Sequence, residues 1–233
     1  MFRKILNTFV AAAGLALATS VGAVSMTFDG AGDSLVTKYL FNIDGAVVNV
    51  TVTYTMTAIT GGQADFDVSL VNSSSGAGQI RLVSFGVDVV APPLTGASTT
   101  SSLPTAGEWE AVNGAILPAF QHVDLCSFSG NNCPGGSNDG IGKGDPPESF
   151  HLILTGNFAS ATPSPSVTFT SPFPGKFQSV GVAGKSYEID ACANPTDCQP
   201  GTPRDTPLPE PGTLALFALG LWGVFASRRR SLD

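Results

Sequence analysis

The stretch from Val47 to Gly62, VVNVTVTYTMTAITGG, alternates between apolar and polar side chains. Side chains of a β-strand point alternately to opposite faces of a sheet, so this pattern predicts a long strand with one buried face. Gly61 and Gly62 predict a turn, and the next segment, ADFDVSLVN, alternates again. The two segments predict a hairpin whose inward residues are Val48, Val50, Val52, Tyr54, Met56, Ala58, Ala64, Phe66, Val68 and Leu70.

A third strand is predicted after the Ser/Gly-rich turn at 72–78. Ile80 and Leu82 have one parity, whereas the apolar residues from Val83 to Val89 have the other. A slip of one residue predicts a β-bulge near Leu82, because a bulge inserts one unpaired residue. Later strands are predicted at 150–154, 167–169, 177–182 and 187–189.

These strands are short and are separated by turns rich in Gly, Pro and Ser, with no helical periodicity before Pro211 in the mature chain. The pattern predicts an all-β fold, an antiparallel β-sandwich formed by one domain over residues 24–194. Two segments, 91–107 and 127–147, are predicted to be long loops. Loops often carry binding residues, so both segments are candidate sites.

The N-terminus predicts a secretory signal peptide over residues 1–23. Arg3 and Lys4 precede an apolar stretch, and small residues lead to a predicted cleavage after Ala23. The following 24–208 segment has six basic and sixteen acidic residues, a net charge of about −10. This charge excludes a nucleic-acid partner, because phosphate binding needs clustered Lys and Arg.

Four cysteines in an exported chain predict disulfides. Local pairing of Cys126 with Cys133 and of Cys192 with Cys198 is favoured among three possible pairings, because each pair would close a short loop. A zinc site is disfavoured, since neither pair has the spacing of a zinc knuckle and the histidines are not at ligand spacing. No metal or other cofactor is expected.

The 129–148 segment also contains oxygen donors of the type that calcium prefers: Asn131, Asn132, Asn138, Asp139, Asp145 and Glu148. The segment does not fit an EF-hand. With Asp139 and Gly140 at positions five and six, position twelve would be Pro146. The spacing therefore favours a solvated, disulfide-closed loop.

No catalytic residue is predicted. His122 and His151 are the only histidines, no serine lies in a G-x-S-x-G motif, and His151 falls on the polar parity of its strand. Glu108 and Glu110 could suggest a glycosidase pair, but the same pattern fits a surface pair on either side of a core tryptophan.

The C-terminus predicts a spacer followed by a membrane helix. Residues 195–208 form a Pro-rich spacer, and residues 212–227 are uncharged and precede Arg228, Arg229 and Arg230. From Pro211 to Ser227 a helix would span about 25 Å, slightly less than a ~30 Å hydrocarbon core, and arginines can snorkel to make up the difference. The arginines predict a stop-transfer signal on the cytoplasmic side, with the ectodomain outside.

Pro209, Glu210 and Pro211, followed by an apolar run and an arginine cluster, resemble the PEP-CTERM sorting signal of bacterial exported proteins. The resemblance implies that exosortase, an integral-membrane transpeptidase, is a partner, and that the chain comes from a bacterium that makes exopolysaccharide. The segment also resembles the LPxTG sortase signal, but Pro211 stands where that signal has threonine. A GPI signal is disfavoured because such a signal should end with apolar residues.

We therefore expect an inner-membrane intermediate that is then sorted to the cell surface or the medium. Its ectodomain is expected to be a structural or adhesive, non-catalytic component of a biofilm or polysaccharide matrix. The alternative is a carbohydrate- or calcium-binding module that uses the two long loops, and a secreted hydrolase is the third hypothesis.

Overall fold

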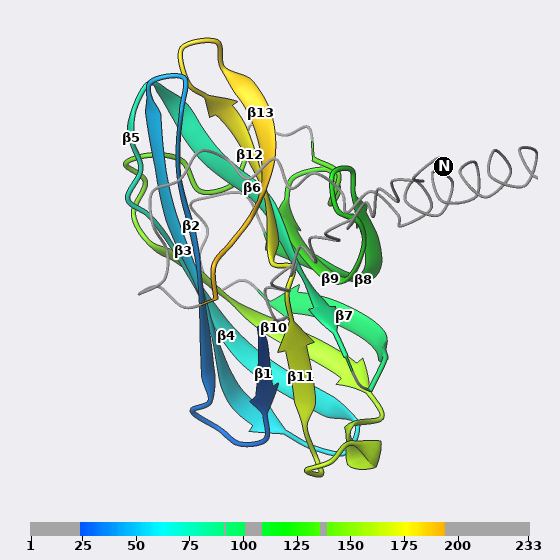
Figure 1. The fold of residues 1–233 in the computed structure, drawn as a ribbon. Coiled ribbons are helices and arrows are strands. Elements are labelled where there is room, and N and C mark those ends of the chain that lie inside the picture. Colours follow the sequence, from blue (N-terminus) through cyan, green and yellow to red (C-terminus); the bar gives the residue numbers. More distant parts are fainter. Residues whose placement is uncertain (1–23, 91, 101–108, 136–138, 194–233) are drawn as a thin grey trace, which may run out of the picture.

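The computed structural model describes residues 24–90, 92–100, 109–135 and 139–193. Nearly all of its regular structure is β-strand, with a single 3-10 turn, η1, in the described part (Figure 1). The elements are β1 (Ser25–Phe28), β2 (Ser34–Ile43), β3 (Ala46–Ile59), β4 (Gln63–Asn72), β5 (Ser75–Gly76), β6 (Gly78–Val89), β7 (Leu94–Thr100), β8 (Trp109–Leu117), β9 (Gln121–Ser129), β10 (Glu148–Gly156), η1 (Phe158–Ser160), β11 (Val167–Thr170), β12 (Pro174–Val180) and β13 (Lys185–Asp190).

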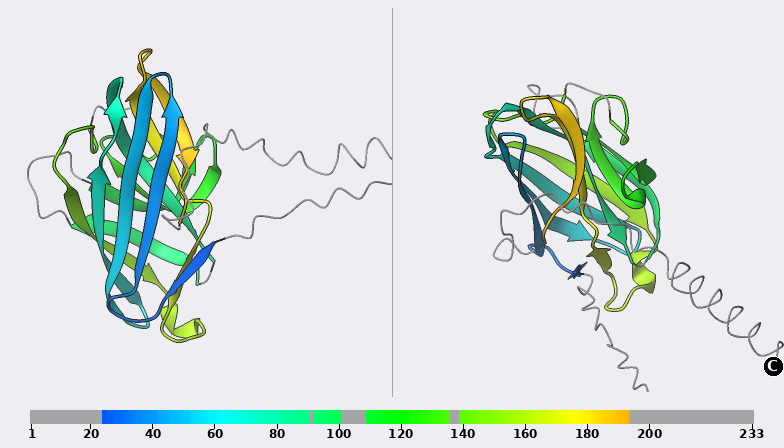
Figure 2. Two further views of the ribbon diagram at one scale, coloured as in Figure 1. Left: turned by 60° about the vertical axis from the view of Figure 1, so that its left-hand side comes forward. Right: turned by 45° about the horizontal axis from the view of Figure 1, so that its top comes forward.

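Within the described residues the strands form two antiparallel sheets, which confirms the predicted all-β sandwich. Sheet 1 has the order β1-β11-β6-β12-β13, with β9 paired to β6 and β8 paired to β9. Sheet 2 has the order β2-β3-β4-β10-β7, with β5 paired to β3. In the left view of Figure 2, the long strands β2 and β3 lie side by side across the front.

The predicted hairpin corresponds to β3 and β4. Its inward residues are buried as predicted, apart from Ala58, which is exposed. The register shifts between Met56 and Ala58, so a bulge turns the end of β3 outward. The predicted turn is also present, because the amide of Thr60 donates to the carbonyl of Gln63 at 2.7 Å.

The bulge predicted in the third strand is confirmed in β6. Lys176 pairs with Ser84 and Phe177 pairs with Leu82, so Val83 has no partner in this ladder and the inward parity changes there.

Some predicted element boundaries were wrong: β7 lies inside the predicted 91–107 loop, and β9 extends into the predicted 127–147 loop. The last predicted strand residue of 177–182 is also corrected, because Val182 lies beyond β12 and is exposed.

The interior between the sheets is rich in aromatic rings. Phe169 of sheet 1 stacks on Phe66 of sheet 2 with ring centroids 5.4 Å apart, and Phe28 meets both rings edge-on. Phe85 similarly contacts Tyr54 and Trp109. Burial of such large side chains is the main stabilising contribution to a sandwich of this kind.

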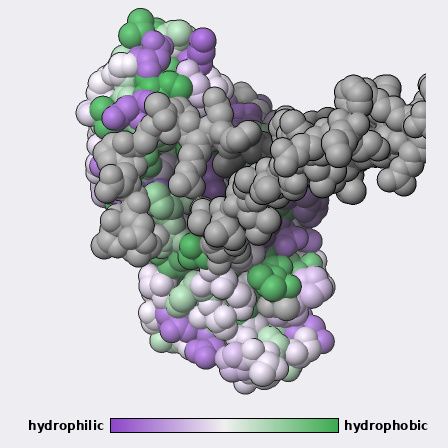
Figure 3. All heavy atoms as spheres, viewed as in Figure 1, coloured by the Kyte–Doolittle hydropathy of each residue, from purple (hydrophilic) through white to green (hydrophobic). Residues whose placement is uncertain are grey.

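Beyond β13 the chain crosses to the other sheet. Lys38 of β2 and Cys192 exchange two backbone hydrogen bonds of 2.8 and 3.0 Å. The end of the described chain is therefore fixed to the edge of sheet 2. On the face shown in Figure 3, the described hydrophobic residues lie in small patches among hydrophilic ones.

Candidate functional site

Several predicted functional residues lie outside the described residues. They are the signal cleavage position Ala23, the motif residues Pro209, Glu210 and Pro211, the stop-transfer residues Arg228, Arg229 and Arg230, and Cys198. The predicted membrane segment 212–227 also lies outside them. In the part of the chain that is described, no helix is long and apolar enough to span a membrane.

The predicted disulfide between Cys126 and Cys133 is present, with both cysteines buried. Cys192 is also disulfide-bonded. The hairpin β8–β9 curls so that Leu117 and Val123 pack with the Cys126–Cys133 disulfide in a second small core. Leu117 and Val123 lie over Gly86 of β6, where an added Cβ would be 3.1 Å from Val123 Cγ2. We call this unit, residues 117–135, the disulfide cap.

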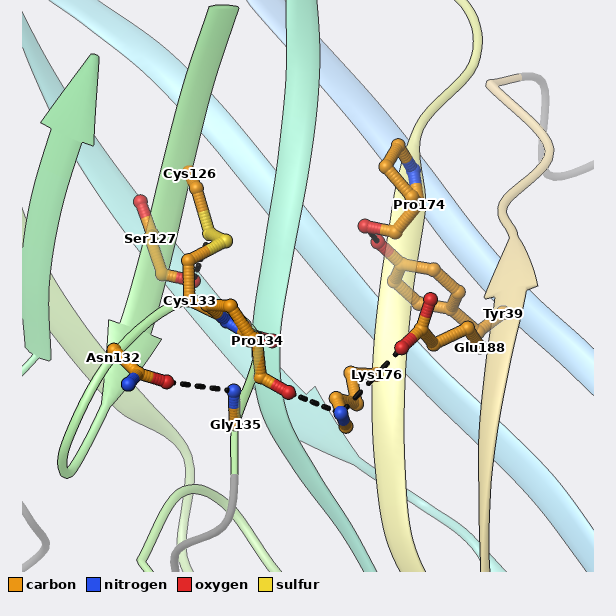
Figure 4. Close-up of a disulfide and its surroundings, with 11 residues drawn as sticks. Tyr39, Cys126, Ser127, Asn132, Cys133, Pro134, Gly135, Pro174, Lys176 and Glu188 are labelled. Carbon is orange, nitrogen blue, oxygen red and sulfur yellow. Dashed lines mark hydrogen bonds and ion pairs between the residues drawn. A yellow bond between two sulfur atoms is a disulfide. The ribbon is translucent and has the colours of Figure 1, made fainter. Parts of the chain in front are cut away.

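Polar contacts hold the disulfide cap on sheet 1 (Figure 4). Lys176 of β12 donates to the carbonyl of Pro134 and lies 3.5 Å from Glu188 of β13. Glu188 in turn accepts the backbone N–H of Ala119 at 2.5 Å, and the hydroxyl of Ser84 donates to the carbonyl of Cys133 at 2.9 Å. The cap is therefore packed against sheet 1, while Asn131, Asn132 and Pro134 of its disulfide-closed loop are exposed, as predicted.

Two of the predicted calcium donors, Asn132 and Asp145, are used in separate local contacts. Asn132 Oδ1 accepts the amide of Gly135, and Asp145 Oδ2 accepts the amide of Gly142 and lies 3.5 Å from Arg81. Asn138 lies outside the described residues. Among the residues that the structure describes, no three His, Cys, Asp or Glu side chains are placed to hold a metal ion.

The two histidines lie on different sheets, His122 on β9 and His151 on β10. His151 projects from the outer face of sheet 2 and is half-buried. Its Nδ1 lies 3.1 Å from Asp67 Oδ1, and its Nε2 lies 3.8 Å from Asp65 Oδ1. Both ring nitrogens therefore lie near carboxylates.

Only one of the two carboxylates considered for a glycosidase lies among the described residues. Glu110 is exposed and Glu108 lies outside the described residues, whereas the tryptophan between them, Trp109, is buried as predicted. Its indole Nε1 donates to Glu148 Oε2 at 2.7 Å. Burial is the main cause that raises the pKa of Glu148. This cross-sheet pair could have been suspected from the inward parity that Glu148 shares with Phe150 and Leu152.

The outer face of sheet 2 carries rows of short polar side chains that the sequence analysis did not assemble. Thr53 on β3 pairs with Ser69 on β4, which pairs with Ser149 on β10. A second row crosses all five strands of the main path and consists of Ser34, Thr55, Asp67, His151 and Thr100. We call these two rows, together with Thr51 and Asp65, the hydroxyl face.

Residues 207–230 match the family model described as the PEP-CTERM protein-sorting motif, which confirms the resemblance. Comparisons with curated proteins and with solved structures found no match. The motif indicates an exported protein that passes through a membrane-anchored intermediate, is processed by exosortase and is then displayed at the surface.

Proposed function

We propose that this sorted protein is a non-catalytic, adhesive or structural component of the cell surface or of an exopolysaccharide matrix. The observation that carries the proposal is the sorting motif at 207–230, which follows an ectodomain built as a packed sandwich. The surroundings of His151 support a non-catalytic role, because the partners of its ring nitrogens among the described residues are the carboxylates of Asp67 and Asp65.

The hydroxyl face is the adhesive surface in this proposal, and its ligand is an uncharged, polyhydroxylated chain. Hydroxyl groups both donate and accept, so they can match the hydroxyls of a sugar chain, and Asp67 offers a charge-assisted acceptor. Threonine is stiff about χ1, so ordering Thr53 and Thr55 on binding costs little entropy. The acidic balance of the mature chain disfavours a polyanion.

Sorting is tested by measuring the intact mass of the protein recovered from cells and from the medium. We expect a chain that begins near Val24 and has lost everything after the Pro209–Pro211 motif. Replacing Pro209, Glu210 and Pro211 together by alanine should block this loss. A full-length chain that remains in the membrane fraction of wild-type cells would contradict the sorting step.

Adhesion is tested by co-sedimentation and affinity electrophoresis with cellulose, dextran, galactomannan and, as an anionic comparison, alginate. We expect retention by at least one neutral polysaccharide, and loss of that retention in a Thr53→Val, Thr55→Val variant, which keeps side-chain shape and strand propensity. The matched control is Thr27→Val, Thr168→Val, because these two threonines contact each other at 2.8 Å on sheet 1. Equal retention of both variants would exclude the hydroxyl face, and no retention on any neutral chain would overturn the adhesive role.

A further inference from the structure

Glu148 is a carboxyl group enclosed between the two sheets. It begins β10 of sheet 2, and only 8% of the residue is exposed. Oε2 accepts one hydrogen bond, from Trp109 Nε1 of sheet 1, whereas Oε1 finds no hydrogen-bond partner among the described residues. Buried polar atoms are normally paired, so this oxygen calls for a physical explanation.

The indole ring that donates to this carboxyl group belongs to an aromatic cluster. The Trp109 ring stacks on Phe150 with centroids 5.7 Å apart and lies 5.3 Å from the centroid of Phe85. Among the described residues, the charged groups that act on Glu148 are Asp145, just before β10, and Arg81 of β6, which lie 3.5 Å from each other. Arg81 is therefore shared with a second carboxylate and only partly compensates a charge on Glu148.

The two protonation states of Glu148 differ strongly in cost at this position. A neutral carboxyl group leaves one hydroxyl without a partner, which is a limited penalty. A carboxylate would be a buried charge with a single hydrogen bond, and the cost of burying such a charge is much larger. Burial therefore raises the pKa of Glu148, and the nearby Asp145 adds to this, while the Trp109 hydrogen bond and Arg81 oppose it.

We propose that the Trp109–Glu148 contact is a pH-responsive latch between the two sheets. With Glu148 neutral, the sheets close tightly around the Trp109 ring. When Glu148 ionises, the carboxylate recruits water and this end of the sandwich loosens. An exported domain meets the pH of its surroundings directly, so the latch makes the packing of the ectodomain depend on external acidity.

The direction of the effect on stability follows from linkage. The pKa of Glu148 is raised in the folded state above its unfolded value. The stabilising contribution is complete at pH values below the unfolded pKa and is lost as the pH rises through the folded pKa. In general, each pKa unit by which the folded value exceeds the unfolded value lowers the folding equilibrium constant about tenfold once the pH is above both values.

The experiment compares the full chain with its Glu148→Gln variant, both carrying Trp222→Phe so that Trp109 is the single tryptophan. Denaturant unfolding and acrylamide quenching of Trp109 fluorescence are measured from about pH 4 to pH 8, which covers the range above the ordinary pKa of glutamate. We expect quenching to increase with pH in the parent chain and to stay constant in Glu148→Gln. The folding equilibrium constant of the parent should decrease relative to that of the variant as the pH rises.

Glu110→Gln is the matched control, because it removes one negative charge from the exposed residue beside Trp109. This control should retain the pH response of the parent. A Glu148→Gln variant with the same pH response as the parent would overturn the proposal. If that variant does not fold, the indole N–H resonance of Trp109 in the parent chain decides: a resonance that moves with pH supports the latch, and one that stays fixed overturns it.

Discussion

The ring of Tyr39 on β2 packs directly against the backbone of Gly175 on β12. A Cβ placed on Gly175 would lie 2.5 Å from Tyr39 Cε1, and the Tyr39 hydroxyl donates to the neighbouring carbonyl of Pro174 at 3.2 Å. Because Gly175 of sheet 1 has no side chain, the ring of Tyr39 from sheet 2 can occupy this space. Tyr39 is buried, so its ring cannot move into solvent.

Replacing Gly175 by alanine should therefore destabilise the fold. Because the added methyl group would overlap a buried ring, we expect a loss of about 1–3 kcal/mol in the free energy of unfolding. Denaturant unfolding measures this loss. Gly62→Ala is the control, since a Cβ there meets nothing within 4 Å. Equal stability of the two variants would contradict the tight contact.

The disulfide cap should depend on its covalent bond. Replacing Cys126 and Cys133 by alanine removes the constraint that this short loop places on the unfolded chain, so we expect a loss of about 2–3 kcal/mol. The cap should also become more accessible to protease, because Leu117 and Val123 pack with this disulfide. Limited proteolysis with mass mapping tests this, and cleavage that is unchanged near residues 117–135 would contradict it.

Asn72 should be essential for the junction between the sheets. Its Nδ2 donates to the carbonyls of Ile80 and Ile141 at 2.8 and 3.0 Å, and its Oδ1 accepts the amide of Ser74 at 3.1 Å. Asn72→Ala leaves these backbone groups without their partner, so we expect a loss of at least about 2 kcal/mol. Asn49→Ala, at a half-buried position on the outer face, should change stability far less.

Asn72 also begins the glycosylation pattern Asn-Ser-Ser. Because its amide nitrogen is buried and already donates two hydrogen bonds, we expect no glycan on Asn72 of the folded protein. Peptide mass mapping of the secreted chain checks this. A modified Asn72 in folded protein would show that modification precedes folding.

The hydroxyl face should resist changes that preserve its shape. Thr53→Val and Thr55→Val lie on half-buried positions of β3, and valine has the same branching as threonine at Cβ. We expect the free energy of unfolding to change by less than about 0.5 kcal/mol, as is usual for surface substitutions. Thermal unfolding measures this, and a larger loss would mean that these hydroxyls stabilise the fold rather than serve a ligand.

The sequence by itself determined the features that depend on neighbouring residues. Each of these features depends on a short stretch of sequence. They are the alternation in β3 and β4, the turn between them, the bulge in β6 and the sorting motif. Strand β2 was missed because Thr37 occupies one of its buried positions, where its hydroxyl donates to the carbonyl of Val52. A polar residue at an inward position interrupts the alternation of apolar and polar residues, and its hydrogen-bond partner is visible only in the folded structure.

The tertiary structure alone decided which distant residues meet. Glu148 looked like a loop ligand in the sequence, but the pairing of β10 with β4 turns it inward, and sheet 1 brings Trp109 against it. The rows of the hydroxyl face likewise depend on the register of five strands. A local pattern sets which way a side chain points, whereas the long-range pairing of strands sets what it touches.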